Sequence, residues 1–293
     1  MRVLITGCYG QVGYCLTQQL ATDENVIVLA LDKERLDITN QDAVNAAVAE
    51  FQPHIIINAA AHTAVDKAEE EVELSYAINR DGPNYLAQAA QSFGAAILHI
   101  STDYVFDGNK TSEYIESDTT NPQGVYGESK LAGEIAVANA CDNHIILRTA
   151  WVFGENGNNF VKTMLGLGAN RNELSVVGDQ FGGPTYAGDI AHTLIQIAKR
   201  IIDGDVVEYG VYHYSGLPHV SWFEFSEVIF DTAVKQKIIL NKPNLTSIAT
   251  DQYPTPAKRP SNSRLNTDKI TNKFAINASD WITALNNIQA YKG

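Results

Sequence analysis

"MRVLITGCYGQVGYCLTQQL" (residues 1–20) is the stretch that decides the expected fold. An apolar run at residues 3–5 leads directly into Gly7, Gly10 and Gly13. A glycine loop that follows a strand and opens a helix allows a tight turn and a close approach of the backbone to a ligand. It also presents a positive helix N-terminus to a pyrophosphate. The spacing is one residue longer than the common G-x-G-x-x-G pattern, and by itself it also fits a plain turn.

Apolar runs of strand length recur at residues 26–31, 55–57, 96–100 and 144–147, and each gap between them is long enough for a helix. This alternation predicts an α/β fold with a doubly wound (Rossmann) parallel sheet, the dinucleotide-binding domain, over residues 1–150. Helices are expected at residues 41–51, capped by Thr39, and at 68–79 and 85–93.

After residue 150 the pattern changes to loop-rich segments at 151–159, 180–185 and 253–266. Helices are expected at 189–201, 222–234 and 279–291. We expect residues 151–293 to form mainly a smaller substrate-binding lobe, with a helix at 187–201 packing back on the first domain. The ligand site is then expected in the cleft between the two lobes.

Composition excludes several classes of function. The 293 residues carry a net charge of −13 with no block of basic residues, so nucleic acid is not an expected partner. No apolar run reaches the ~18 residues of a membrane span, and there is no secretion leader, so no membrane contact and a cytoplasmic location are expected. Three cysteines and seven histidines show no metal-ligand spacing, which predicts no metal site.

A candidate catalytic group follows the fourth expected strand, which ends at Ser101 and Thr102. Tyr126 and Lys130 lie four residues apart, and on a helix this spacing puts both side chains on one face. These residues suit proton transfer to a carbonyl oxygen during hydride transfer. Lys130 would lower the pKa of Tyr126, and Thr102 would hold the reacting oxygen. The alternative is a Tyr–Lys pair that has arisen by chance on a solvated helix face.

The end of the second strand carries conflicting signals about the cofactor. Asp32 lies about 20 residues after the glycine loop, where a carboxylate meets the adenosine ribose and favours NADH. Lys33 and Arg35 follow, and either cation could pair with the 2′-phosphate of NADPH. We therefore predict use of both NADPH and NADH, with less than a ~100-fold preference. Asp32 could equally be a solvated loop carboxylate.

Seven stretches in order along most of the chain resemble the extended short-chain dehydrogenase/reductases: "LITGCYGQVG", "NAAAHTAVDKAEEE", "ISTDYVFDG", "YGESKLAGE", "LRTAWVFG", "DQFGGPTY" and "RPSNSRLNT". In that family the catalytic set is Ser/Thr, Tyr and Lys, which here correspond to Thr102, Tyr126 and Lys130. The resemblance implies reduction of the 4-keto group of dTDP-4-dehydro-L-rhamnose, the last step of dTDP-L-rhamnose synthesis. Hydride would go to carbon, and Tyr126 would supply the proton to oxygen.

The resemblance also implies two sets of binding residues. Those for the cofactor are Gly7, Gly10, Gln11, Val12, Gly13, Asp32, Arg35, Asp37, Ile38, Ala59, Ala60, Ala61, Tyr126 and Lys130. Those for the nucleotide-sugar substrate are Val65, Asp66, Thr102, Asp103, Trp151, Phe181, Pro184, Thr185 and Arg259, the last as a diphosphate partner. Trp151 and Phe181 could instead be core aromatics, and Arg259 a surface charge.

Some members of this family are thought to hold magnesium at a subunit contact through a Glu early in the first helix. The corresponding residue here is Cys15, whose neutral thiol is a poor ligand for a hard cation. Magnesium dependence is therefore doubtful, and a homodimer is a possibility that does not rest on that contact.

Two other functions stay open at this stage. One is a nucleotide-sugar epimerase or dehydratase of the same extended family, in which the cofactor is recycled. The other is a non-catalytic regulatory subunit, since this fold also serves as the regulatory partner of methionine adenosyltransferase. Intact Thr102, Tyr126 and Lys130 favour an enzyme.

Overall fold

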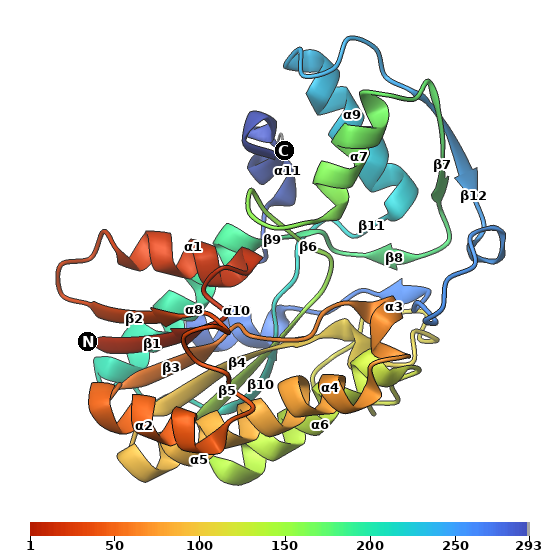
Figure 1. Ribbon diagram of the computed structural model, residues 1–293. Helices are drawn as coiled ribbons and strands as arrows, with labels where there is room; N and C mark the ends of the chain where they lie inside the picture. The colour runs from red at the N-terminus through yellow and green to blue at the C-terminus, as the bar shows by residue number, and fades with distance from the viewer. Residues whose placement is uncertain (292–293) are drawn as a thin grey trace.

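The computed structural model describes residues 1–291 and has a six-stranded sheet at its centre (Figure 1). The strand order is β10-β5-β4-β3-β1-β2, and every neighbouring pair is parallel. The strands are β1 (Arg2–Thr6), β2 (Ile27–Leu31), β3 (Ile55–Asn58), β4 (Ala96–Thr102), β5 (His144–Thr149) and β10 (Gly210–His213). The predicted doubly wound parallel sheet is confirmed. The edge strand β10 was not predicted, because it has four residues and includes a glycine and a histidine.

Helices cover both faces of this sheet (Figure 1). On one face α1 (Gln11–Leu20) lies against α8 (Ala187–Ile202), and on the other lie α2 (Gln41–Phe51), α5 (Gly82–Phe93) and α6 (Val125–Ala140). Val3 and Ile5 of β1 belong to the core on the α1 side, whereas Leu4 belongs to the core on the α5 side. Burial on both faces explains why these strands have continuous apolar sequences.

The start of α2 differs from the prediction in one residue. Asn40 caps the helix by accepting a hydrogen bond from the Ala43 backbone N–H at 3.1 Å. Thr39, the predicted cap, instead donates from its hydroxyl to Asp37 at 2.8 Å. The prediction of Thr39 as the cap is therefore wrong, although the helix itself begins and ends where it was expected.

The single helix predicted for residues 68–79 is wrong. The segment contains α3 (Val65–Ala68), α4 (Val72–Tyr76) and a π-helical turn η1 (Ala77–Asp81) that runs into α5. The Asn79 side chain accepts from the His62 backbone N–H at 2.8 Å and donates to the His62 carbonyl at 3.1 Å and the Ser129 hydroxyl at 3.0 Å. These tertiary bonds favour the irregular path, and helical periodicity carries no sign of them.

The second lobe is built from α7 (Phe160–Gly168), β7 (Glu173–Val177), α9 (Trp222–Lys235), β12 (Asn244–Ile248) and α11 (Trp281–Leu285), followed by the 3-10 turn η4 (Ile288–Tyr291). α7, α9 and α11 enclose an aromatic core that contains Phe153, Phe225 and Trp281. α9 starts at a capping box of Ser221 and Glu224. The helix predicted for 279–291 is wrong in length, because α11 ends at Leu285, and α7 was not predicted.

Three later segments return to the central sheet: α8, β10 and α10 (Asp268–Phe274). Tyr212 of β10 and Phe274 of α10 lie in the same core as α1 and α8. Short strand pairs connect the two parts of the molecule: β6 (Val152–Phe153) with β9 (Thr185–Tyr186), and β8 (Phe181–Gly182) between β11 (Val220–Ser221) and β13 (Asn262–Ser263). The chain therefore crosses several times between the sheet and the second lobe.

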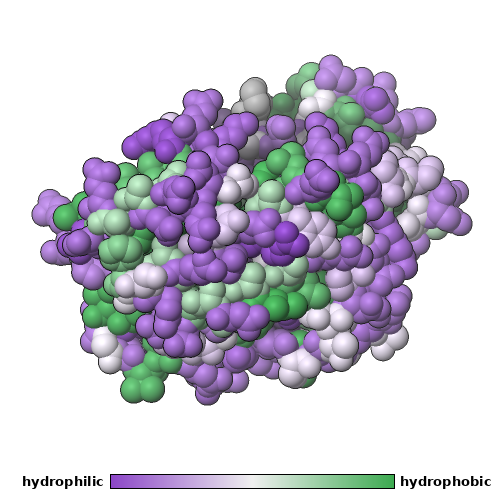
Figure 2. Space-filling view, turned by 60° about the horizontal axis from the view of Figure 1, so that its bottom comes forward, coloured by the Kyte–Doolittle hydropathy of each residue, from purple (hydrophilic) through white to green (hydrophobic). Residues whose placement is uncertain are grey.

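Hydrophobic side chains on the face shown in Figure 2 lie in small groups between hydrophilic ones. Figure 2 brings forward the lower side of Figure 1, where α2, α5 and α6 cover the sheet. Among residues 1–291, no helix combines the length and the apolar character that crossing a membrane requires.

Candidate active site

The glycine loop is folded tightly against the turn that follows β3. Gly7 has a φ of +70°, and its carbonyl accepts a hydrogen bond from the Gly10 N–H at 2.9 Å. A Cβ on Gly7 would lie 2.7 Å from the backbone nitrogen of Ala60, and one on Gly13 would lie 2.1 Å from the Gly7 oxygen. Both positions therefore require glycine, and the predicted tight turn and close packing are present.

The N-terminus of α1 fits an anionic group. Gly10 is its N-cap, with no side-chain hydrogen bond to the first turn and no acidic residue in that turn. The Gln11 side chain is engaged elsewhere, because its Oε1 accepts from Asn159 Nδ2 at 3.0 Å. The backbone N–H groups of residues 11–13, in the first turn of α1, are therefore available to an anionic group such as a pyrophosphate.

The predicted ribose-binding residues lie beside this loop. Asp32 accepts a hydrogen bond from the Arg35 backbone N–H at 3.0 Å, while Arg35 Nη1 donates to the Ala30 carbonyl at 3.1 Å. Burial and the Asp32 charge raise the pKa of the Cys8 thiol, and the Arg35 charge lowers it, so both charges act on the loop. Asp37 accepts from Thr39. Ile38 is buried against α5.

The predicted catalytic residues meet at the carboxyl end of β4. Thr102 is the last residue of that strand, and Tyr126 lies in the first turn of α6. Thr102 donates a hydrogen bond from its hydroxyl to Asp103 Oδ1 at 3.1 Å. The Tyr126 ring packs edge-on against Tyr104, with centroids 5.3 Å apart. Residues from β4, the turn after it and α6 are thus brought together where open α/β sheets bind ligands.

Burial raises the pKa of Tyr126 to about 12; a hydrogen bond with the Thr102 side chain opposes this rise, and the Asp103 charge adds to it. Lys130 takes no part, because its Nζ donates to the Ile100 carbonyl at 2.7 Å. The predicted lowering of the Tyr126 pKa by Lys130 is therefore wrong. Tyr126 retains its proton near neutral pH, as a general acid must.

Two further groups in this site have shifted pKa values. Burial lowers the pKa of Lys130 to about 8, and the Glu134 charge opposes this shift. Burial raises the pKa of Asp103 to about 6, against hydrogen bonds from Ser263 and Thr102. Asp103 Oδ2 is buried without a hydrogen-bond partner among the described residues. Such an orphaned acceptor is typical of a site that a ligand completes.

A cleft of about 720 Å³ lies between this site and the second lobe. Tyr104, Trp151 and Arg259 line it, as do Phe160, Arg171 and Trp222, which sequence analysis did not single out. The Trp151 and Trp222 rings stack with centroids 3.5 Å apart. Trp222 opens an amphipathic helix, where an aromatic residue has no signature that separates binding from packing.

Trp151 has an unfavourable backbone conformation. Its φ is +48°, in the left-handed region that disfavours residues with a Cβ. A Cβ on Gly182 would lie 2.6 Å from the Trp151 ring, so glycine is needed there for the ring to fit. Trp151 therefore lies between Gly182 and the Trp222 ring, at the wall of the cleft.

Two predicted substrate residues bind each other. Arg259 donates to both carboxylate oxygens of Asp66, at 2.9 Å and 3.3 Å, and the Ala257 N–H also donates to Asp66. Both side chains are partly exposed. Asp66 thus holds the guanidinium at the edge of the cleft.

Other predicted substrate residues do not line the cleft. Thr185 is fully buried, donating to the Gly183 carbonyl and accepting from the Gly216 N–H, and Pro184 is buried beside it. Phe181 is exposed on β8, and Val65 is half-buried at the start of α3. Ala59, Ala60 and Ala61 follow β3, and the first two pack against Gly7.

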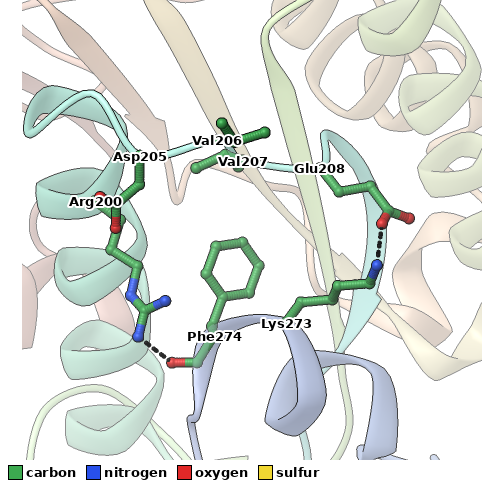
Figure 3. Close-up of a pocket in the computed structure, with 7 residues that line it drawn as sticks. All are labelled: Arg200, Asp205, Val206, Val207, Glu208, Lys273 and Phe274. Atoms are coloured by element: carbon green, nitrogen blue, oxygen red, sulfur yellow. Dashed lines mark hydrogen bonds and ion pairs between the residues drawn. The ribbon is translucent and has the colours of Figure 1, made fainter.

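A second hollow, of about 410 Å³, lies at the sheet edge formed by β10, near the amino end of that strand (Figure 3). Glu208 pairs there with Lys273, and Arg200 donates to the Phe274 carbonyl at 2.7 Å. These charged groups bind protein atoms, and none of the predicted site residues lines this hollow. We place the active site in the larger cleft.

Cys15, the residue that replaces the magnesium-linked Glu, is buried in α1. Burial raises the pKa of its thiol to about 12, with smaller contributions from Glu155 and Asp189, so the thiolate that binds metals is strongly disfavoured. Within residues 1–291, no group of three or more His, Cys, Asp or Glu side chains could hold a metal ion. The absence of magnesium dependence stays a prediction.

The parallel sheet, the glycine loop after β1 and the Thr–Tyr–Lys set beside β4 define a Rossmann-fold protein of the extended short-chain dehydrogenase/reductase class. The family model described as "RmlD substrate binding domain" matches residues 1–291, and the chain belongs to this family.

Several relatives are similar over nearly the whole chain. A protein of Aggregatibacter actinomycetemcomitans named dTDP-4-dehydrorhamnose reductase is 54% identical over 290 residues, which is 99% of each chain. A structure described as a dTDP-4-dehydrorhamnose reductase from Clostridium acetobutylicum has a TM-score of 0.90 and 42% identity, covering 98% of each chain. Another, from Bacillus anthracis in complex with NADP, has a TM-score of 0.89 and 40% identity, covering 98% of this chain and 97% of the other.

Proposed function

We propose that this protein reduces the 4-keto group of dTDP-4-dehydro-L-rhamnose to give dTDP-L-rhamnose, with NADPH or NADH as the hydride donor. The observation that carries this proposal is the placement of Tyr126, in the first turn of α6, against the Tyr104 ring, two residues after Thr102 at the carboxyl end of β4. The relatives named dTDP-4-dehydrorhamnose reductase, which match nearly the whole chain, support the choice of substrate.

Each residue has a role that follows from its position. The nicotinamide supplies a hydride to carbon 4 when the cofactor is bound. Tyr126, whose pKa is raised to about 12, gives its proton to the oxygen at that carbon. Thr102, whose hydroxyl donates to Asp103 Oδ1 in this structure, turns that donor to the same oxygen when substrate binds and so orients it.

The cofactor choice follows from the charges beside the loop. The Asp32 carboxylate accepts bonds from ribose hydroxyls, and Arg35, whose side chain is exposed, can reach a 2′-phosphate. We propose that both NADPH and NADH are used. The Bacillus anthracis structure in complex with NADP is consistent with room for the 2′-phosphate.

Oxidation of reduced cofactor tests the proposal. With dTDP-4-dehydro-L-rhamnose as substrate, we expect one equivalent of NADPH or NADH to be oxidised for each equivalent of sugar product. An epimerase or dehydratase would leave the total of reduced cofactor unchanged. No turnover with this or other nucleotide sugars would favour the regulatory subunit instead.

We propose that the substrate nucleotide lies in the 720 Å³ cleft, with its base near Trp151 and Trp222 and its diphosphate near Arg259. The stacked indoles offer a flat apolar wall to a base. The Asp66 carboxylate fixes the guanidinium, which can then hold a phosphate through two charge-assisted hydrogen bonds. Five other residues stay predicted substrate-binding residues: Val65, Asp103, Phe181, Pro184 and Thr185.

Arg259→Ala is expected to raise the substrate KM about tenfold or more, since a hydrogen-bonded charged contact contributes about 1.5–3 kcal/mol. The affinity for NADPH should change little, because Arg259 lies on the cleft side of the site. Arg200→Ala, at the distant hollow, is the matched control and should leave the substrate KM unchanged. An unchanged KM in Arg259→Ala would remove Arg259 from the site.

The proposal also covers the division of the chain into two parts, the oligomeric state and the location in the cell. We propose that the cofactor lies mainly on residues 1–150 and the substrate mainly on residues 151–293, with α8 supporting the first part through its contact with α1. A homodimer and a cytoplasmic location also remain part of the proposal.

A further inference from the structure

A line of buried polar side chains runs beneath the active site and ends at Lys130. Thr6 and Asn58 are the last residues of β1 and β3, His99 lies on β4, and all three are at most 1% exposed. The Thr6 hydroxyl donates to Asn58 Oδ1 at 2.7 Å, and Asn58 Nδ2 lies 2.9 Å from His99 Nδ1. The other ring nitrogen, His99 Nε2, lies 3.4 Å from Lys130 Nζ.

The backbone fixes the orientation of the Asn58 amide. The Ala60 N–H donates to Asn58 Oδ1 at 3.1 Å, and a backbone N–H can only donate. If the amide were reversed, its NH₂ group would face that N–H without an acceptor. Oδ1 therefore faces Ala60 and Thr6, and Nδ2 faces His99 as a donor.

The orientation of Asn58 fixes the tautomer of His99. Because Asn58 Nδ2 donates, His99 Nδ1 must accept and cannot carry a proton. Burial and the Lys130 charge hold the pKa of His99 well below its ordinary value, so the ring is neutral and its single proton lies on Nε2. That N–H points at Lys130 Nζ.

We propose that Asn58 and His99 position the Lys130 amino group and make it a poorer proton acceptor, so that His99 is a positioning residue of the active site. A ring N–H that faces an ammonium opposes its charge, whereas the same N–H donates to the lone pair of a neutral amine. The remaining contact, from Nζ to the Ile100 carbonyl, holds the amino group against β4.

The other titratable groups around Lys130 do not supply this effect. Tyr126 and Glu134 lie on its own helix, Asp103 follows β4, and Arg148 on β5 is paired with Glu134. Of these, Glu134 acts on Lys130 and raises its pKa, against the lowering by burial. The ring N–H of His99 adds to that lowering.

The buried polar side chains are also connected to the glycine loop. Ala60, whose N–H orients Asn58, is the residue that Gly7 packs against, at 2.7 Å from a Cβ placed on that glycine. A change at the glycine loop can thus reach Lys130 through Asn58 and His99. The role of Lys130 in the reaction rests on the proposed function, but the tautomer and the proton affinity can be measured without substrate.

The tautomer is tested by nitrogen-15 NMR of the histidine-labelled protein, with the His99 signal assigned by its loss in His99→Phe. We expect a neutral ring with the proton on Nε2 throughout the neutral pH range. A proton on Nδ1 would overturn the proposal. This measurement uses the unmodified chain, so it decides the question even if a variant does not fold.

The effect on Lys130 is tested by Asn58→Asp and a carbon-13 NMR titration of labelled lysines, assigned with Lys130→Met. The aspartate places an acceptor against His99 Nδ1, which moves the ring proton there and lets Nε2 accept from the ammonium. We expect the midpoint of the Lys130 titration to rise by about one pH unit, which is about a tenfold gain in proton affinity, while burial still holds it below the ordinary value of a lysine. An unchanged midpoint would overturn the proposal.

The charge of the new carboxylate is separated from the tautomer by a double-mutant cycle. In a His99→Phe background no ring nitrogen connects residue 58 to Lys130, so Asn58→Asp should raise the midpoint by less than half as much. An equal rise in both backgrounds would assign the effect to charge alone and contradict a role for His99. Because no step uses substrate, these outcomes are independent of the reductase assay.

Discussion

Tyr126→Phe is expected to slow turnover about 100-fold or more and to leave cofactor affinity nearly unchanged. The phenol is the group that donates a proton to the reacting oxygen, and general acid catalysis contributes about 100-fold or more. Burial keeps the Tyr126 pKa at about 12, so the phenol carries its proton at working pH. In Tyr126→Phe, water cannot donate a proton from the same position. The measurement is kcat with dTDP-4-dehydro-L-rhamnose, with NADPH affinity measured separately.

Tyr104→Phe is the matched control, because its ring packs edge-on against Tyr126 at 5.3 Å and also borders the cleft. Removing this second hydroxyl should change turnover far less. If Tyr104→Phe were the slow variant and a folded Tyr126→Phe had near-normal turnover, the two tyrosines would exchange roles in the mechanism.

The sequence predicted those parts of the fold that depend on local pattern. β1 is entirely apolar at residues 3–5 because it is buried on both faces, and the glycine spacing follows from contacts that exclude a Cβ at Gly7 and Gly13. Tyr126 and Lys130 were found because helical geometry relates them directly. These signals lie within one element or in its immediate neighbours along the chain.

Features that depend on distant residues were not predictable in this way. The path of η1 follows from bonds between Asn79 and both His62 and Ser129, 17 and 50 residues away. Trp222 reaches the cleft only because it stacks on Trp151, which lies far from it along the chain. The Lys130 amino group turns toward the Ile100 carbonyl and His99, so its expected effect on Tyr126 is absent. Each of these requires the tertiary structure.

α6 carries the catalytic residues, and a buried ion pair holds it on the sheet. Tyr126, Lys130 and Glu134 follow at four-residue spacing along one face of the helix. Arg148 on β5 donates to both oxygens of Glu134, at 2.9 Å and 2.6 Å, and the Ser101 hydroxyl donates at 2.5 Å. Arg148 also lies 5.1 Å from the centre of the Phe106 ring. These contacts fix the height of the helix relative to the carboxyl end of β4.

Glu134→Ala is accordingly expected to lower the free energy of unfolding by about 3–5 kcal/mol, the cost of leaving one buried charge without its partner. The pair is at most 5% exposed, so water cannot take over the lost hydrogen bonds of Arg148. Urea unfolding followed by both fluorescence and circular dichroism measures the change. Asp231→Asn, in the exposed pair with Lys242, is the control and should cost at most about 1 kcal/mol.

The double variant Glu134→Leu with Arg148→Met separates charge from packing in the same experiment. Because apolar side chains of similar size carry no desolvation cost, this variant should recover most of the stability that Glu134→Ala loses. A loss in the double variant as large as in Glu134→Ala would show that packing volume, rather than the unpaired guanidinium, sets the cost. A loss below about 1 kcal/mol in Glu134→Ala itself would mean that Arg148 finds another partner in the core, and that the ion pair does not fix α6 on the sheet.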